Sequence, residues 1–137
     1  MNRLIRFGVS LDSGLLEKFD SYTKTNNYSN RSKAIADLIR GVFVEQEWAQ
    51  GKSVAGAIMI VYDHHKRELV NKLVNIQHDF QDTIISSQHV HLDHDNCLEI
   101  IIVKGKTTSI KKLASMLKAE KGVKYSSLTA ATTGKHL

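Results

Sequence analysis

The first part of the chain alternates between polar and apolar side chains. The polar positions are Arg6, Gly8 and Ser10, and the apolar positions are Ile5, Phe7, Val9 and Leu11. A period of two residues is typical of a half-buried β-strand, because successive side chains of a strand point to opposite faces. The pattern therefore predicts a strand over residues 3–11, with its three polar positions on one face.

Two stretches of helical periodicity follow this strand. Asp12 occupies a helix N-cap position, and apolar residues then recur every three or four positions until an Asn-Asn turn. This predicts a first helix over residues 13–25. A second helix, capped by Ser29 or Asn30, is expected to run to about Trp48. Its apolar face consists of Ala34, Ile35, Leu38, Ile39, Val42 and Phe43.

This strand-helix-helix unit is too small to be stable as a single copy. Its strand has two unpaired edges, and two short helices bury too little apolar surface to offset the loss of chain entropy. We expect two copies to pair their strands antiparallel over a four-helix core, with the polar side chains of both strands projecting outward. A two-stranded ribbon of this kind fits the major groove of DNA.

A polar break at residues 49–53 separates this first domain, residues 1–48, from a second pattern. The segments predicted beyond the break are strand 54–62, helix 66–80, strand 83–92, strand 97–104, helix 109–121 and strand 124–132. This βαββαβ order is the ferredoxin-like arrangement. The predicted fold class is α+β, with a ferredoxin-like second domain over residues 54–137.

Two predicted strands of this second domain carry candidate metal ligands. His89 and His91 share a face, because one residue separates them on a strand. Pairing of His91 with Cys97 across the turn would bring two imidazoles and the single cysteine of the chain together, since cross-strand partners share a face. The same register places His89 opposite Glu99. Glu99 could then accept a hydrogen bond from a ligating imidazole and fix its orientation.

His78, on the preceding helix, is the fourth candidate ligand. Val90 and Leu92 alternate with the two strand histidines, and we expect them to face the core and that helix. The histidines would then point away from the helix, so His78 would come from another subunit. Three imidazoles and one thiolate suit zinc in a tetrahedral site or nickel(II) and copper(II) in a planar one, and ligand type alone does not choose among them.

Composition adds charge and further histidines to this picture. The 137 residues include 19 Lys and Arg against 14 Asp and Glu, and the net charge of +5 favours a polyanionic partner. Of the remaining histidines, His64, His65 and His94 are expected at the surface or in a secondary site, and His136 is expected to be inert. The chain has no long apolar run and no signal-peptide pattern, so we expect a cytoplasmic protein without a membrane span.

Four motifs occur together in this sequence: Tyr28-Ser29-Asn30-Arg31-Ser32, His78, His89-Val90-His91 and Asn96-Cys97-Leu98-Glu99. Together they resemble the NikR family of nickel-responsive repressors. The resemblance implies a ribbon-helix-helix domain followed by an ACT-like domain, assembled as a homotetramer that is a dimer of dimers. It also implies one nickel(II) per subunit as cofactor, bound by His89, His91 and Cys97 of one chain and by His78 of a neighbour.

The resemblance further implies operator double-stranded DNA as the partner and Arg6, Gly8 and Ser10 as base-reading positions. Arg6 can donate two hydrogen bonds to guanine, and Ser10 can hydrogen-bond a base edge. Gly8 has no side chain and departs from the threonine or serine of relatives. The family pattern therefore does not supply the operator sequence.

Phosphate contacts are expected at two places. Arg31 and Ser32 fall in the first turn of the second helix, where unpaired backbone N–H groups and the helix dipole attract anions. Lys66 and Arg67 match family residues that touch the DNA backbone. The four residues are expected to position DNA without reading its sequence.

One departure from the family concerns an alkali ion. Some members hold such an ion with a glutamate and an aspartate of the second helix, and this chain keeps Asp37 but has Lys33 in place of the glutamate. Because the two residues are four apart on a helix, we expect them to pair. The pair predicts weak or no alkali-ion binding there.

Two other classes of function are open to the sequence. A regulator with the same DNA-binding unit could respond to an amino acid or another small molecule through its ACT-like domain, but residues 62–68 lack the glycine-rich loop that holds such ligands. A metalloenzyme needs an open coordination position and a general base, and four protein donors would close the site. We therefore expect a nickel-dependent transcriptional repressor that is not an enzyme.

Overall fold

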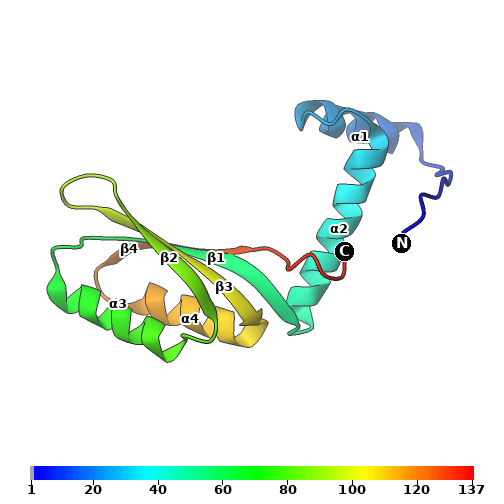
Figure 1. Ribbon diagram of the computed structural model, residues 1–137. Coiled ribbons are helices and arrows are strands. Elements are labelled where there is room, and N and C mark those ends of the chain that lie inside the picture. The colour runs from blue at the N-terminus through cyan, green and yellow to red at the C-terminus, as the bar shows by residue number, and fades with distance from the viewer. Residues whose placement is uncertain (1) are drawn as a thin grey trace. The chain divides into compact units, whose positions relative to one another are not determined.

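The computed structural model describes residues 2–137, which form two compact units, one ending at Gly41 and the other beginning at Val42. The boundary falls inside α2, so this helix contributes residues to both units. The elements, in chain order, are α1 (Ser13–Thr25), α2 (Arg31–Ala49), β1 (Ser53–Tyr62), α3 (Arg67–Asp79), β2 (Ile84–His91), β3 (Cys97–Lys106), α4 (Thr107–Ala119) and β4 (Val123–Ala130) (Figure 1).

Both helices of the first unit begin at predicted caps. A carboxylate oxygen of Asp12 accepts a hydrogen bond from the backbone N–H of Leu15 at 2.9 Å, which satisfies one of the free donors at the start of α1. The Asn30 side chain does the same for the N–H of Lys33 at 2.8 Å. Between the helices, Asn27 adopts a positive φ of 59°, a conformation that asparagine tolerates well. The predicted helices are confirmed, and Asn30 is the cap of α2.

The predicted strand over residues 3–11 is wrong for the single chain, because residues 2–12 form neither helix nor strand. A strand requires a hydrogen-bonded neighbour, and one chain offers none to this segment. Its large apolar side chains are exposed, from 46% for Leu11 to 89% for Leu4. Within the described part of the first unit, Ala34 is the only buried apolar residue.

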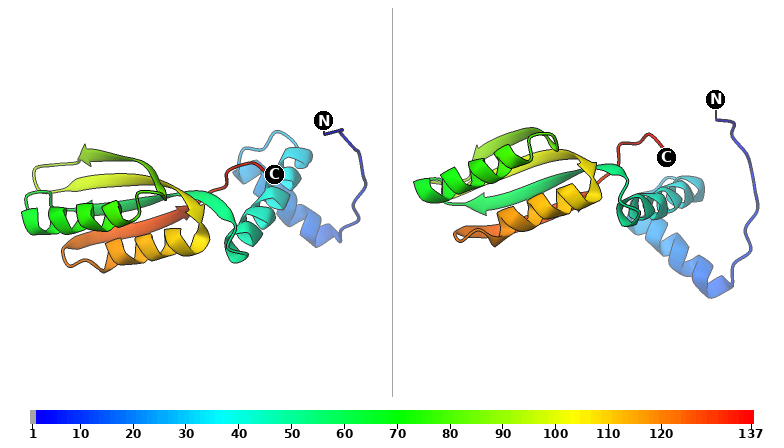
Figure 2. Two further views of the ribbon diagram at one scale, coloured as in Figure 1. Left: turned by 60° about the horizontal axis from the view of Figure 1, so that its bottom comes forward. Right: turned by 90° about the horizontal axis from the view of Figure 1, so that it is seen from below.

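The second unit is an antiparallel four-stranded sheet with two helices on one face. The strand order is β2-β3-β1-β4. Helices α3 and α4 lie side by side on the same face of the sheet in both views of Figure 2. The predicted βαββαβ order and the α+β class are confirmed.

Alternate residues of the two central strands and the inner sides of α3 and α4 form the core. Its fully or almost fully buried apolar members include Val54, Ile58, Ile60, Tyr62, Leu69, Leu73, Ile101, Val103, Ile110, Leu113 and Leu117. Trp48, at the end of α2, joins this core and donates a hydrogen bond to the carbonyl oxygen of Ala131 at 2.8 Å. Gly56 leaves room for that ring, because a Cβ there would lie 3.4 Å from it and 2.8 Å from the carbonyl oxygen of Thr129.

The other face of the sheet has no helix over it among the described residues. Ile85, Tyr125 and Ile102 are 61%, 60% and 38% exposed. Apolar side chains on three of the four strands, β2, β3 and β4, thus remain in contact with solvent in one chain. None of the described helices combines the length and the apolar composition needed to cross a membrane.

Candidate metal centre

The pairing of β2 with β3 has the register that a metal site requires. His91 pairs with Cys97, and His89 pairs with Glu99, as predicted. The five-residue connection, residues 92–96, is closed by a hydrogen bond from the Leu92 N–H to the Asn96 carbonyl oxygen at 2.9 Å. This tight turn fixes the register and confirms the predicted alignment of the two strands.

The predicted direction of the two histidines is wrong. Val90 and Leu92, expected in the core, are 36% and 55% exposed, whereas Cys97 and Glu99 are 0% and 2% exposed. Since cross-strand partners share a face, His89 lies on the buried side of the sheet, the side that α3 and α4 cover. β2 is the edge strand, so the helices cover it incompletely, and the side chain of His89 remains 50% exposed.

His89 has a thiol on one side of its ring and a carboxylate on the other. Its Nδ1 lies 3.7 Å from Cys97 Sγ, and its Nε2 lies 3.2 Å from Glu99 Oε1. An imidazole that binds a metal through one nitrogen commonly donates its other N–H to a carboxylate. This arrangement suits a metal ligand oriented by Glu99.

The buried carboxylate of Glu99 is itself held by two donors. The Tyr62 hydroxyl donates to Oε2 at 2.9 Å, and the Gln77 side chain donates to Oε1 at 3.1 Å. Burial and the neighbouring charge of Glu99 raise the pKa of Tyr62, so this phenol remains a donor. The sequence pattern did not single out Tyr62 or Gln77. The role of Tyr62 follows only from its pairing with Cys97 between β1 and β3.

Cys97 is fully buried at the start of β3. Burial raises the pKa of its thiol above the ordinary value, and the negative charge of Glu99 raises it further. A thiolate there requires a compensating positive charge, which a bound metal ion supplies. With imidazole as the neighbouring donor, the site has the ligand types that first-row transition metals such as nickel and zinc prefer.

The single chain does not gather all four predicted ligands. Within residues 2–137, no group of three predicted ligands has its ligand atoms within 4.8 Å of one another. The predicted ligands are His78, His89, His91 and Cys97. His78 lies in the last turn of α3. The ring of His91 packs edge-on against His64, with 4.4 Å between ring centroids. His89 and Cys97 are therefore the pair that the fold of one chain brings together.

The residues predicted to contact DNA lie in both units. Arg6, Gly8 and Ser10 are exposed in the extended segment before α1. Arg31 makes a two-bond ion pair with Asp20, with both N–O distances at 2.8 Å. The hydrogen bond from Arg31 lowers the pKa of Asp20.

The expected pairing of Lys33 with Asp37 is confirmed. Lys33 and Arg40 both make ion pairs with Oδ1 of Asp37, and the Tyr28 hydroxyl donates to Oδ2 at 3.1 Å. The carboxylate therefore has three donors from its own unit. These contacts satisfy the charge of Asp37 without an added cation.

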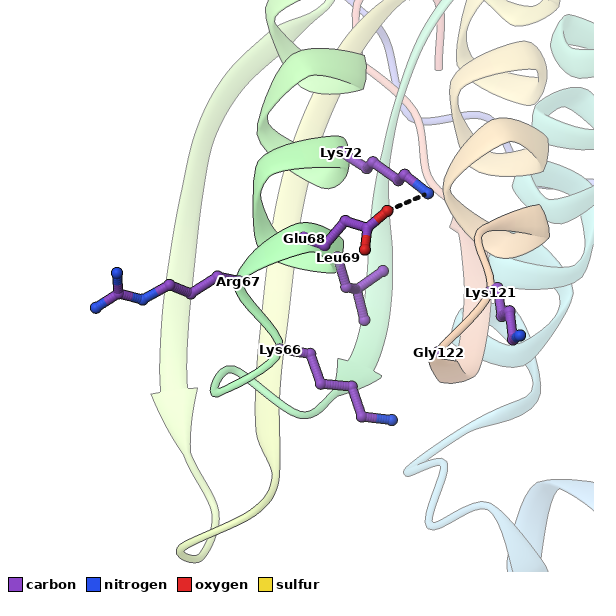
Figure 3. A pocket seen from close by; sticks show the side chains of 7 residues that line it. All are labelled: Lys66, Arg67, Glu68, Leu69, Lys72, Lys121 and Gly122. Carbon is purple, nitrogen blue, oxygen red and sulfur yellow. Dashed lines mark ion pairs between the residues drawn. The ribbon is translucent and has the colours of Figure 1, made fainter.

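Lys66 immediately precedes α3, and Arg67 is its first residue. Both line a shallow pocket with Glu68, Leu69, Lys72, Lys121 and Gly122 (Figure 3). The Arg67 side chain points away from the others in this view, and Glu68 pairs with Lys72 at 3.4 Å. Lys66, before α3, and Lys121, in the loop after α4, thus place two positive side chains near the start of α3, where an anion is favoured.

Together, the fold and the donor set define a candidate metal-binding domain of the α+β class. Residues 55–131 match the family described as the NikR C terminal nickel binding domain. A protein of Syntrophus aciditrophicus is 56% identical over 98% of both chains, and one of Chlorobium limicola is 54% identical over 98% of this chain and 100% of its own. Both are described as candidate nickel-responsive regulators. The chain belongs to this family of nickel-responsive regulators.

A solved structure supports the fold alone. An uncharacterized protein of Thermotoga maritima superposes with a TM-score of 0.54, at 13% identity, over 59% of this chain and all of that one. At such low identity the likeness carries no information about ligands.

Proposed function

We propose that this protein is a nickel-dependent transcriptional repressor that binds operator double-stranded DNA and catalyses no reaction. The observation that carries the proposal is the alignment of His91 with Cys97 and of His89 with Glu99. This alignment gives a domain of the nickel-binding family a thiol and an imidazole at 3.7 Å, with a carboxylate behind the imidazole.

The proposed nickel ligands are His89, His91 and Cys97 of one chain and His78 of a neighbouring chain, with one nickel(II) per subunit. Within residues 2–137 of one chain, no three of these four side chains bring their ligand atoms within 4.8 Å of one another, and the family resemblance implies that His78 comes from a neighbouring subunit. Glu99 would hold the ring of His89 in place. A nickel ion held by these residues would supply the positive charge that stabilises the thiolate of Cys97.

The proposed DNA-binding domain is residues 1–48, joined by residues 49–53 to a nickel-binding and tetramerisation domain at 54–137. Two copies of residues 3–11 would pair as a β-ribbon of a ribbon-helix-helix dimer. The exposed apolar side chains of this segment and of both helices support that pairing, since they need a partner surface. Arg6, Gly8 and Ser10 of each copy would face the bases.

The proposed assembly is a cytoplasmic homotetramer, with two DNA-binding dimers joined through the metal domains. The open apolar face of the sheet is a surface on which such an assembly could form. The phosphate contacts would come from Arg31, Ser32, Lys66 and Arg67. Arg31 would leave its ion pair with Asp20 to bind a phosphate. Since nickel favours DNA binding, DNA must tighten nickel binding by the same factor.

The test uses the purified full-length protein and a DNA duplex selected from a random-sequence library in the presence of nickel. Binding of that duplex is measured with and without one equivalent of nickel, beside the ultraviolet-visible spectrum. We expect nickel-dependent binding and a thiolate-to-nickel charge-transfer band. The proposal is refuted if the protein binds the duplex equally with and without nickel, or if its nickel complex lacks the thiolate charge-transfer band.

A further inference from the structure

The last strand of the second unit contains a β-bulge at Lys124. Tyr125 pairs with Val61 of β1, and Val123 pairs with Tyr62, so Lys124 is the extra residue between two successive pairs. A bulge bends its strand and redirects a side chain, and bulges are common beside functional sites. Lys124 therefore departs from the regular alternation of β4.

The bulge lies at the level of the candidate metal centre. Four residues pair in a row across the sheet, one from each strand: Val123, Tyr62, Cys97 and His91. Lys124 follows the first member of this row, and two proposed nickel ligands are its last two members. Continuous strand pairing thus connects the bulge in β4 with Cys97 and His91.

The side chain of Lys124 makes a second, direct connection to the same region. Its Nζ donates a hydrogen bond to Asn96 Oδ1 at 2.5 Å, although 28 residues separate the two in the sequence. The turn between β2 and β3 and the start of β4 lie at the same end of the sheet (Figure 1). A hydrogen bond from a charged donor is stronger than one between neutral groups. This contact ties β4 to the turn between β2 and β3.

Asn96 is the residue that closes this turn. Its carbonyl oxygen accepts the backbone N–H groups of Leu92 at 2.9 Å and of Asp93 at 3.4 Å. Its side-chain nitrogen donates to both carboxylate oxygens of Asp93 at 2.9 Å, while its Oδ1 accepts from Lys124. Cys97 is the next residue in the chain. The orientation of Asn96 is therefore fixed by both partners, directly before a proposed nickel ligand.

The turn needs this support because β2 is an edge strand. Among the described strands, β2 pairs with β3 alone. Pairing on one side leaves the end of β2 less stable than the central strands. A shift of β2 by one residue would turn His89 and His91 to the face opposite Cys97. A contact that holds the turn opposes such a shift.

We propose that Lys124 is a positioning residue for the nickel site, because it holds Asn96 and with it the alignment of His91 with Cys97. This role rests on the proposed function, since it assumes that nickel binds to these ligands. Lys124 supplies no ligand atom. It orders the turn before nickel binds and so reduces the entropy that binding must offset. Its loss should weaken nickel binding without changing the ligand set.

The test compares full-length wild type with Lys124→Ala, Lys124→Arg and Lys112→Ala. Nickel affinity is measured by competition with a chelator, and the thiolate-to-nickel charge-transfer band reports occupancy. We expect Lys124→Ala to bind nickel about 10-fold more weakly, with the same band at saturation. Lys124→Arg keeps a charged donor and should bind more tightly than Lys124→Ala. Lys112→Ala removes an exposed lysine of α4 and should match wild type.

Hydrogen–deuterium exchange of the nickel-free proteins separates positioning from general stability. We expect faster exchange in Lys124→Ala at residues 91–97 and unchanged exchange in α3 and α4, because only the turn loses a contact. Faster exchange throughout the second unit would overturn the proposal, since Lys124 would then stabilise the whole domain. Exchange at residues 91–97 equal to that of wild type would also overturn it.

The charge-transfer band distinguishes failure of this role from failure of the proposed function. Unchanged nickel affinity of Lys124→Ala, with the band present in wild type, would overturn the positioning role and leave the nickel centre standing. Wild type without the band would refute the nickel centre, and the role of Lys124 with it.

Discussion

The two units of this chain bury apolar surface to very different extents. The second unit encloses a core of fully buried Ile, Leu and Val side chains between its sheet and two helices. In the described part of the first unit, Ala34 alone is a buried apolar residue, while Phe7, Leu15 and Leu38 are 69%, 50% and 47% exposed. Yet the sequence shows apolar periodicity in both units.

The difference shows that a regular apolar pattern does not imply a core within one chain. Burial of apolar surface is the main favourable term in folding, so the first unit gains little of it alone. Its helices are stabilised by their N-caps and by the ion pair between Asp20 of α1 and Arg31 of α2. We infer that the missing partner surface is a second copy of the same segment.

The largest effect is expected from a charged residue on the apolar face of the N-terminal segment. We expect Phe7→Asp to weaken self-association through the first unit by about 100-fold or more, since burying an unpaired charge costs about 3 kcal/mol or more. Analytical ultracentrifugation over a concentration series measures the effect. Unchanged association would show that Phe7 is not part of an interface.

Arg6→Ala is the matched control, one residue away and on the opposite face of the expected strand. It should leave association unchanged and weaken DNA binding by about 1 to 3 kcal/mol.

The second unit should respond to loss of core volume instead. Ile101 is 0% exposed on β3, and its neighbour Ile102 is 38% exposed on the other face. We expect Ile101→Ala to reduce the free energy of unfolding by about 2 to 5 kcal/mol, because it leaves a cavity in the core. Ile102→Ala should cost clearly less. Urea titration measures both, and equal losses would contradict the assigned faces of the strand.

The smallest effect concerns the ion pair of the first unit. Arg31 lowers the pKa of Asp20 below its ordinary value of 3.8. A depressed carboxyl pKa in the folded state adds stability above the unfolded value, and that stability is lost as the pH falls through the folded pKa. Arg31→Ala should therefore raise the pKa of Asp20 and flatten the loss of helicity below pH 4. Carboxyl NMR titration would show an unchanged pKa if the pair does not form in solution.

Sequence periodicity located all the described helices and strands of the second unit, because β1, β3, α3 and α4 contribute buried residues to a core within the same chain. The sequence left the register of β2 on β3 open, because a connection of four residues would turn Cys97 away from both histidines. The structure has the five-residue connection, which pairs His91 with Cys97. The α2 cap and the Lys33–Asp37 pair depend on contacts only three or four residues apart. Local spacing is sufficient for such features.

Features that depend on longer-range packing were harder to predict. Val90 and Leu92 are more apolar than histidine and were expected in the core, yet β2 is an edge strand whose buried side is set by Cys97 and Glu99 on its neighbour. The contacts of Tyr62 and Gln77 with Glu99 cross between elements that no spacing rule connects. The N-terminal strand requires a second chain, which the sequence indicates but one chain cannot form.

We propose that nickel held through Cys97 controls DNA binding. The most direct measurement is the affinity of the full-length protein and of Cys97→Ala for the selected duplex, with and without one equivalent of nickel. We expect nickel to strengthen binding by wild type and to have no effect on Cys97→Ala, with unfolding curves that show both proteins folded. A folded Cys97→Ala protein whose DNA binding responds to nickel as strongly as wild type would contradict the claim.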